Sequence, residues 1–149
     1  MTDFIIRDFK KSDVTAVYQI EKQCFSNPWS EKALLDEIEN PNANFLVCQK
    51  DKAICGYIGS IFVCDEASVT NVAVSLAFRR QGVGEKLVLS LISRAREKGI
   101  SSIFLEVRES NEAAQKLYEK CGFKAISVRK DFYSNPKEDA TIMKYEMIK

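Results

Sequence analysis

The sequence predicts an α/β (α+β) fold: a mixed sheet of about seven strands with helices on both faces. In the first half of the chain, short apolar segments with strand character follow one another closely, as in an antiparallel meander. In the second half, strand and helix patterns alternate, which implies at least one parallel pairing. The length of 149 residues and the hydrophobic content of 46% suit one compact domain, residues 1–149, with a core between a sheet and its helices.

The first half contains two helix signals among its strands. Ser12-Asp13 can cap a helix that runs through about Cys24, since apolar residues recur near one of its faces. The loop Asn27-Pro28-Trp29-Ser30 breaks this helix, and its serine can cap a second one over residues 31–39. The strands are expected at residues 4–7, 45–49, 54–63 and 67–74.

In the second half, a longer helix is expected from Val83 to Lys98, with one broad apolar face and a glycine after it. Apolar residues alternate between positions 103 and 107, which predicts a strand. A short helix capped by Ser110 or Asn111 is expected to end at Gly122. The last elements are a pair of strands, residues 123–130 and 140–147, around a polar loop.

The overall charge and the N-terminus indicate where such a protein works. The net charge of +1 gives no bulk attraction to nucleic acid or to an anionic membrane. No apolar run approaches the roughly 18 to 20 residues of a membrane span, and the N-terminus lacks the basic and apolar regions of a signal peptide. We therefore expect a cytoplasmic protein with no nucleic-acid or membrane partner, and the oligomeric state stays open.

Cysteine and histidine usage limit the chemistry. The five cysteines form no Cys-x-x-Cys pair, and without an export signal they are expected to be free, buried thiols. The chain has no histidine, which removes Ser-His and Cys-His nucleophile pairs and histidine-based metal sites. We therefore expect no metal, and acid–base chemistry falls to Glu, Asp, Tyr, Lys, Cys or water. The cysteines are Cys24, Cys48, Cys55, Cys64 and Cys121.

The most informative motif is the run Arg79-Arg80-Gln81-Gly82-Val83-Gly84, between a predicted strand and a predicted helix. Glycines there let main-chain N–H groups approach a ligand closely, and the start of a helix is electropositive. The run therefore predicts a phosphate site. It matches neither the P-loop nor the dinucleotide-binding spacing. The alternative is an ordinary strand-to-helix turn with exposed arginines.

Glu106 is the first candidate for proton transfer. It lies in a strongly apolar predicted strand, on the same face as Phe104 and Arg108. A carboxylate there is partly desolvated unless it lies at an open end, and desolvation raises its pKa toward the range of a general base. A strand-end glutamate paired with Arg108 or with a lysine is an equally good interpretation.

Three residues of the helix predicted between residues 110 and 122 have structural interpretations that need no catalytic role. Tyr118 falls on the apolar face, where a core tyrosine with its hydroxyl at the rim is favoured. Asn111 suits a helix cap, and Cys121 suits packing because nothing nearby in the sequence activates it.

Trp29, the only tryptophan, and Tyr133 lie in predicted loops, where each either covers the core or lines a recognition groove.

Taken together, these segments resemble the GNAT superfamily of N-acetyltransferases. The family signature, Arg/Gln-x-x-Gly-x-Gly/Ala between a strand and a helix, is matched by Arg79, Gly82 and Gly84. The resemblance covers nearly the whole chain and implies a GNAT-like acyl-CoA N-acyltransferase fold. Among subfamilies, the chain is most similar to the bacterial ribosomal-protein-alanine N-acetyltransferases. The segments that carry this similarity are Pro28-Trp29-Ser30, Leu105-Glu106-Val107-Arg108, Ser110-Asn111, Leu117-Tyr118, Gly122-Phe123 and Glu138-Asp139-Ala140.

The resemblance implies a role for each part. Glu106 is implied as the general base, acting through water, and Tyr118 as the general acid that protonates the leaving thiolate. Acetyl-CoA is implied as the acetyl donor, with its pyrophosphate on the glycine run and its pantetheine arm along the preceding strand. The residues placed at acetyl-CoA are Val72, Ala73, Val74, Arg79, Arg80, Gln81, Gly82, Val83, Gly84, Glu85, Asn111 and Tyr118. The acceptor is expected at Trp29 and Tyr133.

Two positions depart from the family pattern. Glu85 stands where a basic residue is common and places a negative charge beside the expected phosphates. Phe132 replaces the first residue of a Tyr-Tyr pair, and the loop after it lacks a glycine. The two changes in this loop lie on the acceptor side and put the acceptor's identity more in question than the donor's.

The chemistry of the acceptor amine favours a protein N-terminus. Near pH 7.5, about a third of α-amines are neutral, against on the order of 0.1% of lysine side chains, and only the neutral amine attacks a thioester. The leading hypothesis is therefore an N-α-acetyltransferase for a protein N-terminus, in particular the N-terminal alanine of a small-subunit ribosomal protein. A small-molecule amine or a peptidyl lysine is the alternative acceptor, and a CoA-binding regulatory module without turnover is the alternative class.

Overall fold

A seven-stranded sheet with the strand order β1-β2-β3-β4-β5-β7-β6 organises the computed structural model, which describes residues 3–147. Every neighbouring pair is antiparallel except β4 and β5, which are parallel. The predicted mixed sheet, with its antiparallel meander and at least one parallel pairing, is confirmed. The strands are β1 (Ile5–Asp8), β2 (Leu46–Lys50), β3 (Ala53–Val63), β4 (Glu66–Val74), β5 (Ser102–Arg108), β6 (Lys124–Tyr133) and β7 (Glu138–Glu146).

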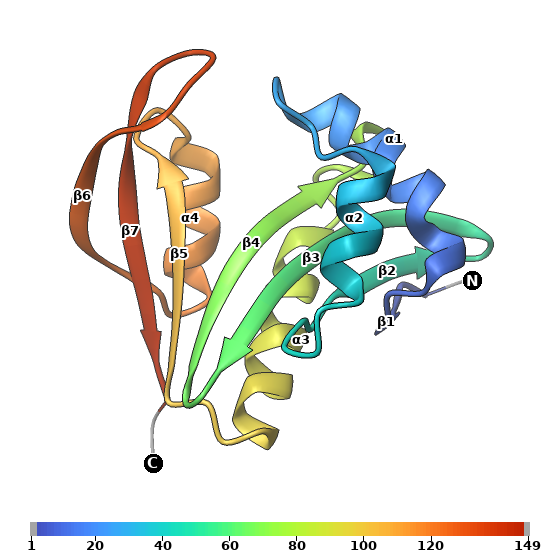
Figure 1. Ribbon diagram of the computed structural model, residues 1–149, viewed down its shortest axis with the longest axis horizontal. Helices are drawn as coiled ribbons and strands as arrows, with labels where there is room; N and C mark the ends of the chain where they lie inside the picture. The colour runs from blue at the N-terminus through green and yellow to red at the C-terminus, as the bar shows by residue number, and fades with distance from the viewer. Residues whose placement is uncertain (1–2, 148–149) are drawn as a thin grey trace.

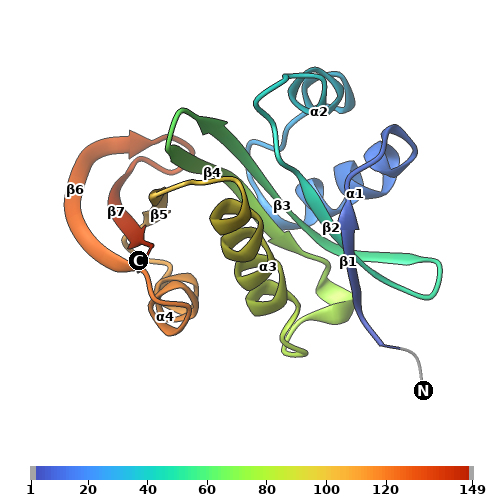
Figure 2. The same ribbon diagram turned by 90° about the horizontal axis from the view of Figure 1, so that it is seen from below.

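Helices cover both faces of the sheet, as predicted. Figure 2 shows α1 and α2 on one face and α3 and α4 on the other. One core cluster, which includes Leu87, Leu91 and Ile103, packs under α3 and α4, and a second, which includes Leu34 and Tyr57, packs under α1 and α2. The helices are α1 (Val14–Cys24), α2 (Glu31–Ile38), α3 (Val83–Glu97) and α4 (Glu112–Lys120), with short 3₁₀ turns at Lys11–Asp13 and Leu76–Phe78.

The feature that creates a site is the parting of β4 from β5. Their pairing is confined to Glu66–Ser68 against Ser102–Phe104, at one end of both strands. Beyond it the strands diverge, and Figure 1 shows the sheet opening as a V between them. The polar main-chain groups that face β5 along the second half of β4 therefore have no partner strand.

An extra residue in β4 accompanies this opening. Gly59 pairs with Asn71 and Ser60 with Val69, so Thr70 between them has no partner on β3. Such a bulge bends its strand and increases its twist. Gly59 is required opposite it, because a Cβ atom there would lie 2.7 Å from the Thr70 hydroxyl and 2.7 Å from the Phe45 ring.

The helix ends follow the predicted caps, with one exception. The Ser30 hydroxyl accepts from the Ala33 N–H at 3.1 Å, and glycines in the left-handed region follow α3 and α4. Asp13, however, does not cap α1 with its side chain. Its buried carboxylate instead accepts from the Arg7 guanidinium at 2.8 and 2.9 Å and from the Lys10 N–H at 2.8 Å. This interaction joins β1 to the start of α1.

Two further expectations need correction. β6 continues to Tyr133, so Phe132 and Tyr133 end a strand and do not lie in the loop. All five cysteines are free, but Cys64 is exposed in the turn after β3 and Cys24, the last residue of α1, is half-buried at the edge of the second core cluster. None of the helices within residues 3–147 is long and apolar enough to cross a membrane.

Candidate active site

A cavity of about 490 Å³ occupies the opening between β4 and β5. Its walls come from the end of α1, the α1–α2 loop, the bulge of β4, the end of β5, the start of α4 and the β6–β7 loop. Among the predicted site residues it gathers six: Trp29, Val72, Glu106, Asn111, Tyr118 and Tyr133. Residues far apart in the sequence thus meet at one place, which is what a site requires.

Glu106 lies on the β5 wall with its side chain exposed in the cavity. The expected desolvation is therefore absent, because the strand is open at this end and has no neighbour on the β4 side. The alternative pairing with Arg108 is also wrong, since Arg108 forms its ion pair with Glu138, with 3.3 Å between nitrogen and oxygen. Among the described residues, Glu106 has no ion pair, so its carboxylate is available to exchange protons.

Tyr118, on α4, belongs to the core cluster and also lines the cavity. Only 8% of the residue is exposed, and its ring packs on Phe123 at a centroid distance of 5.9 Å. Burial raises the pKa of this phenol well above its ordinary value, and the neighbouring Tyr133 adds to the effect. The hydroxyl therefore stays protonated at neutral pH and can donate a proton.

Tyr133 lies beside Glu106 at the end of β6. Burial, together with the negative charge of Glu106, raises the pKa of Tyr133 to about 12. The Arg108 guanidinium lies 4.4 Å from the centre of the Tyr133 ring, in a cation–π contact that fixes the ring. Tyr133 is thus a neutral hydroxyl held next to the exposed carboxylate.

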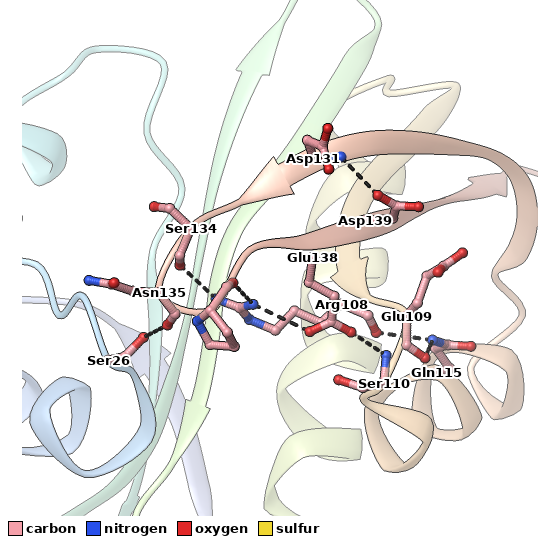
Figure 3. A network of polar contacts seen from close by, with 11 residues as sticks. Ser26, Arg108, Glu109, Ser110, Gln115, Asp131, Ser134, Asn135, Glu138 and Asp139 are labelled. Carbon is pink, nitrogen blue, oxygen red and sulfur yellow. Dashed lines mark hydrogen bonds and ion pairs between the residues drawn. The ribbon is translucent and has the colours of Figure 1, made fainter.

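Arg108 organises the β6–β7 loop, and Figure 3 shows the network. Its guanidinium donates to the Pro136 carbonyl at 2.8 Å and to the Ser134 carbonyl at 3.2 Å. Glu138, its ion-pair partner, also accepts from the Ser110 N–H at 2.6 Å, ahead of α4. These contacts hold the loop against β5 and the start of α4.

The two loops at the mouth of the cavity are tied to each other. The Ser26 hydroxyl donates to the Asn135 carbonyl at 2.6 Å (Figure 3). The Asn135 amide donates to the Asn27 side-chain oxygen at 3.3 Å. The α1–α2 loop and the β6–β7 loop therefore bridge the open side of the V. We call this part, residues 25–30 and 134–137, the two-loop end of the cavity.

Trp29 forms part of this end. Its ring is half-buried, tilted against Phe45 at a centroid distance of 6.4 Å, and it lines the cavity. The Trp29 N–H donates to the Glu21 carboxylate at 2.9 Å. Trp29 thus both covers the core and borders the cavity, so its position is compatible with both interpretations, a core cover and the wall of a groove.

The predicted phosphate segment, residues 79–85, lies outside the cavity, at the start of α3; we call it the glycine-loop end. Gly82 has φ +79°, in the left-handed region, and a Cβ there would meet nothing within 4 Å. The first N–H groups of α3 follow it and have no partner within the helix. Glycine suits position 84 for a different reason. A Cβ there would lie 3.1 Å from Leu117 of α4, so this glycine permits close packing of α3 on α4.

Charged side chains at the glycine-loop end are partly paired. The Arg79 guanidinium turns back to the end of β4, at 3.4 Å from the Val74 carbonyl and 3.3 Å from the Cys24 sulfur. Glu85 accepts from the Lys120 ammonium at 3.1 Å. Lys120 thus neutralises the negative charge that departs from the family pattern.

The remaining predicted residues lie on β4 and at the two ends of α4. Val72 lines the cavity, whereas Ala73 is buried beneath it and Val74 ends β4. Asn111 caps α4, with its side-chain oxygen accepting from the Ala114 N–H at 3.1 Å, and it also lines the cavity. Cys121 is buried in the core cluster, as predicted, and burial raises the pKa of its thiol.

Sequence reasoning missed Glu21, Thr70 and Asn71, all of which line the cavity. The Thr70 hydroxyl oxygen is buried and has no hydrogen-bond partner within residues 3–147. A signal existed for Glu21, since it is a charged residue on the buried face of a predicted amphipathic helix, four positions after Val17. Nothing in the sequence marked Thr70, because a bulge has no local pattern in a strand of this composition.

Comparison with known proteins agrees with this arrangement. The profile of the acetyltransferase (GNAT) family matches residues 14–123. A ribosomal protein bS18-alanine N-acetyltransferase of Escherichia coli is 36% identical over 140 residues, covering 93% of this chain and 94% of that protein. A Bacillus subtilis protein that carries the same name provisionally is 39% identical over 143 residues, covering 95% of both.

Solved structures agree as well. The crystal structure of the ribosomal-protein-S18-alanine N-acetyltransferase from Escherichia coli superposes with a TM-score of 0.90 at 31% identity, covering 99% of this chain and 97% of that one. Ard1 from Thermoplasma volcanium also gives a TM-score of 0.90, at 28% identity over 98% and 99% of the two chains. The chain therefore belongs to the acetyltransferase (GNAT) family and is an acetyl-CoA-dependent N-acetyltransferase.

Proposed function

We propose that this enzyme acetylates the N-terminal amine of a protein, with the N-terminal alanine of ribosomal protein bS18 as its foremost candidate. The observation that carries the proposal is that Glu106 and Tyr118 meet in one cavity, beside the unpaired edge of β4. The similar proteins from Escherichia coli and Bacillus subtilis are named for this acceptor.

The residues present suit acetyl-CoA, which supplies the acetyl group as a thioester. The open left-handed turn at Gly82 and the first N–H groups of α3 are suited to its pyrophosphate. The main chain of Val72, Ala73 and Val74 is suited to its extended arm, since this part of β4 lacks a partner strand. Asn111 lies where it can donate its side-chain amide to the same arm, because its oxygen is used in capping α4.

The proton transfers fall to Glu106 and Tyr118. The Glu106 carboxylate accepts a proton from the acceptor amine through water, which leaves the nitrogen lone pair free to attack. The Tyr118 hydroxyl donates a proton to the sulfur that leaves. The raised pKa of Tyr118 keeps that proton in place before the reaction. No enzyme nucleophile is required, in keeping with the absence of histidine.

The two-loop end is suited to an acceptor that enters by its end. The α1–α2 and β6–β7 loops are joined across the cavity by Ser26 and Asn135, so a chain terminus reaches Glu106 more easily than the middle of a segment does. Trp29 and Tyr133 line this entrance. An α-amine also needs less help to lose its proton than a lysine does.

Mass spectrometry of peptide products tests the proposal. A peptide with a free N-terminal alanine is incubated with the enzyme and acetyl-CoA, beside a peptide of the same sequence that has a blocked N-terminus and an internal lysine. We expect acetylation of the first peptide at its α-amine and little reaction with the second. Acetylation of the lysine peptide alone, or competition by spermidine at the acceptor site, would contradict an N-terminal acceptor.

A further inference from the structure

Glu21 is a buried carboxylate that the proposed proton transfers do not use. It lies on the buried face of α1 with none of its surface exposed. Its Oε2 atom accepts from the Tyr57 hydroxyl at 2.6 Å and from the Asn71 amide at 3.0 Å, and its Oε1 atom accepts from the Trp29 N–H at 2.9 Å. Among the described residues, no cation pairs with it.

A carboxylate in this environment carries a large desolvation cost. Burial without a cation is unfavourable for the charged form, and only the three hydrogen bonds offset it. A neutral side chain of similar size would pack here without that cost. Each of the three donors comes from a different segment of the chain, so the carboxylate joins three segments.

The three donors belong to the α1–α2 loop, to β3 and to β4. Trp29 and Asn71 line the cavity, as Glu21 does, whereas Tyr57 is fully buried between them and the core. The Asn71 amide also lies 3.0 Å from the Tyr57 hydroxyl, which closes a ring of three side chains. Asn71 is the residue next to the bulge at Thr70. The carboxylate therefore joins the loop that carries Trp29 to the bulged part of β4.

The two-loop end has contacts on its other side that are independent of Glu21. The β6–β7 loop is held by Arg108 and by the tie between Ser26 and Asn135. Among residues 3–147, the Trp29 main chain forms no hydrogen bond besides the one to Glu21, and it lies in a segment without regular structure. Its hydrogen bond to Glu21 fixes the part of the loop that faces β4.

We propose that Glu21 is a positioning residue for the acceptor: it holds Trp29 and the bulge of β4 at the separation that an incoming N-terminus requires. This inference rests on the proposed function, since it assigns the acceptor to the two-loop end. Glu21 itself exchanges no proton with the acceptor, because both of its oxygens are occupied by donors from the protein.

Steady-state kinetics of Glu21→Ala and Glu21→Gln test the inference, with the free-alanine peptide and acetyl-CoA varied separately. For Glu21→Ala we expect the KM for the peptide to rise about tenfold or more, since mispositioning by about 1 Å is enough to cost such factors. The KM for acetyl-CoA should rise by clearly less than the KM for the peptide, because the glycine-loop end does not contact Glu21. Glu21→Gln keeps one acceptor oxygen and should recover part of the peptide affinity.

The single tryptophan supplies a readout that does not depend on turnover. Trp29 is the only tryptophan of the chain, so its emission reports the α1–α2 loop directly. We expect a red shift of this emission in Glu21→Ala without any substrate, and a smaller shift in Glu21→Gln. Val88→Ala, in the core cluster under α3, is the control for lost stability and should change neither the emission nor the peptide KM.

Several outcomes would overturn the inference. Equal changes in both KM values, an unchanged Trp29 emission, or the same changes in Val88→Ala would mean that Glu21 acts only through stability. If Glu21→Ala does not fold, Glu21→Gln and Asn71→Ala decide, because each leaves part of the ring in place. If the wild-type enzyme acetylates no N-terminal peptide, the proposed function fails, whereas the emission of Trp29 still tests whether Glu21 holds the loop.

Discussion

At the glycine-loop end, the molecule presents main-chain N–H groups and a left-handed glycine. At the two-loop end it presents side chains: Glu21, Arg108 and Glu138 hold segments that lie far apart in the sequence. The first end depends on backbone conformation over a few consecutive residues. The second depends on long-range hydrogen bonds, each of which a single substitution removes.

This difference gives the two ends different sensitivities. A backbone site tolerates most side-chain changes but not a change at the glycine that sets its conformation. A site built on buried polar side chains loses its geometry when one member of the network is replaced. We therefore expect variants of the cavity side chains to change kcat or the acceptor KM, and variants of the glycine loop to change the KM for acetyl-CoA alone.

Glu106→Gln should produce the largest effect. General-base catalysis contributes about 10²–10⁴-fold, and the exposed carboxylate of Glu106 has no structural partner among the described residues, so its loss should fall on kcat. We expect kcat to drop by about 10²-fold or more with both KM values little changed. Thermal unfolding should be unaltered, since no ion pair is removed. A variant that keeps most of its kcat would show that Glu106 is not the base.

Tyr118→Phe should reduce kcat by on the order of 10²-fold, because the proton for the leaving sulfur is lost while the ring still fills the core. In the wild-type enzyme, burial raises the pKa of Tyr118 well above its ordinary value. An acid with a raised pKa keeps its proton to higher pH, so we expect no loss of kcat between neutral pH and about pH 9. A loss of activity over that range in the wild type, absent from Tyr118→Phe, would contradict the raised pKa, and a Tyr118→Phe variant that keeps most of its kcat would contradict the acid role.

The glycine run was predictable from the sequence because its physics is local. A left-handed turn, an open helix start and the preceding strand lie within residues 69–84, and glycine spacing records them directly. The elements of the sheet and the helix faces were predictable for a similar reason, since apolar periodicity marks which side of each element is buried. Asn111 and Ser30 were recognised as caps because capping is also a contact between near neighbours.

The two-loop end was not predictable in the same way. The Glu21 carboxylate meets Tyr57 and Asn71 across 36 and 50 residues of sequence, and Ser26 meets Asn135 across 109. No local pattern specifies such a partner. Glu106 illustrates the same limit: its strand composition suggested burial, but the divergence of β4 from β5, a property of the whole sheet, leaves it exposed.

Gly82→Ala, compared with Gly99→Ala, tests the glycine-loop end. The two glycines have φ +79° and +78°, each has open space around a Cβ, and they flank the same helix α3. Each substitution should cost about 1–2 kcal/mol of stability, because alanine is strained in the left-handed region. Only Gly82→Ala should raise the KM for acetyl-CoA, by about fivefold, with kcat and the peptide KM unchanged. Equal KM values in the two variants would remove the glycine loop from the donor site.

The pH dependence of stability tests the two-loop end through Glu21. Burial raises the pKa of Glu21 above its ordinary value, against the opposing hydrogen bonds from Tyr57, Trp29 and Asn71. The folded state then binds the proton more tightly than the unfolded chain does. The contribution of Glu21 to stability is complete below the ordinary pKa of a glutamate and is lost as the pH rises through the pKa of Glu21 in the folded state.

Glu21→Gln should lack this contribution, so the wild-type Tm minus the variant Tm should be larger near pH 4 than near pH 7. We expect the difference to change by about 2 °C or more, measured by thermal unfolding of both proteins in the same buffers. The Tyr57 hydroxyl, which faces Glu21, does not ionise in this pH range, because its pKa is raised far above the range. A Tm difference that is constant or grows with pH would mean that Glu21 is not held by burial.

Glu85→Gln should give the smallest effect. The Lys120–Glu85 ion pair is 3.1 Å long, with 67% and 32% of the two side chains exposed, so its loss should cost under about 0.5 kcal/mol. The substitution leaves the charge of Lys120 unpaired near the start of α3, where it favours a phosphate. We therefore expect the KM for acetyl-CoA to fall by about twofold or less, and the gain to disappear at about 0.5 M salt because of screening. A higher KM in Glu85→Gln would show that Glu85 itself orders the glycine-loop end, and that this end, like the other, depends on a side chain.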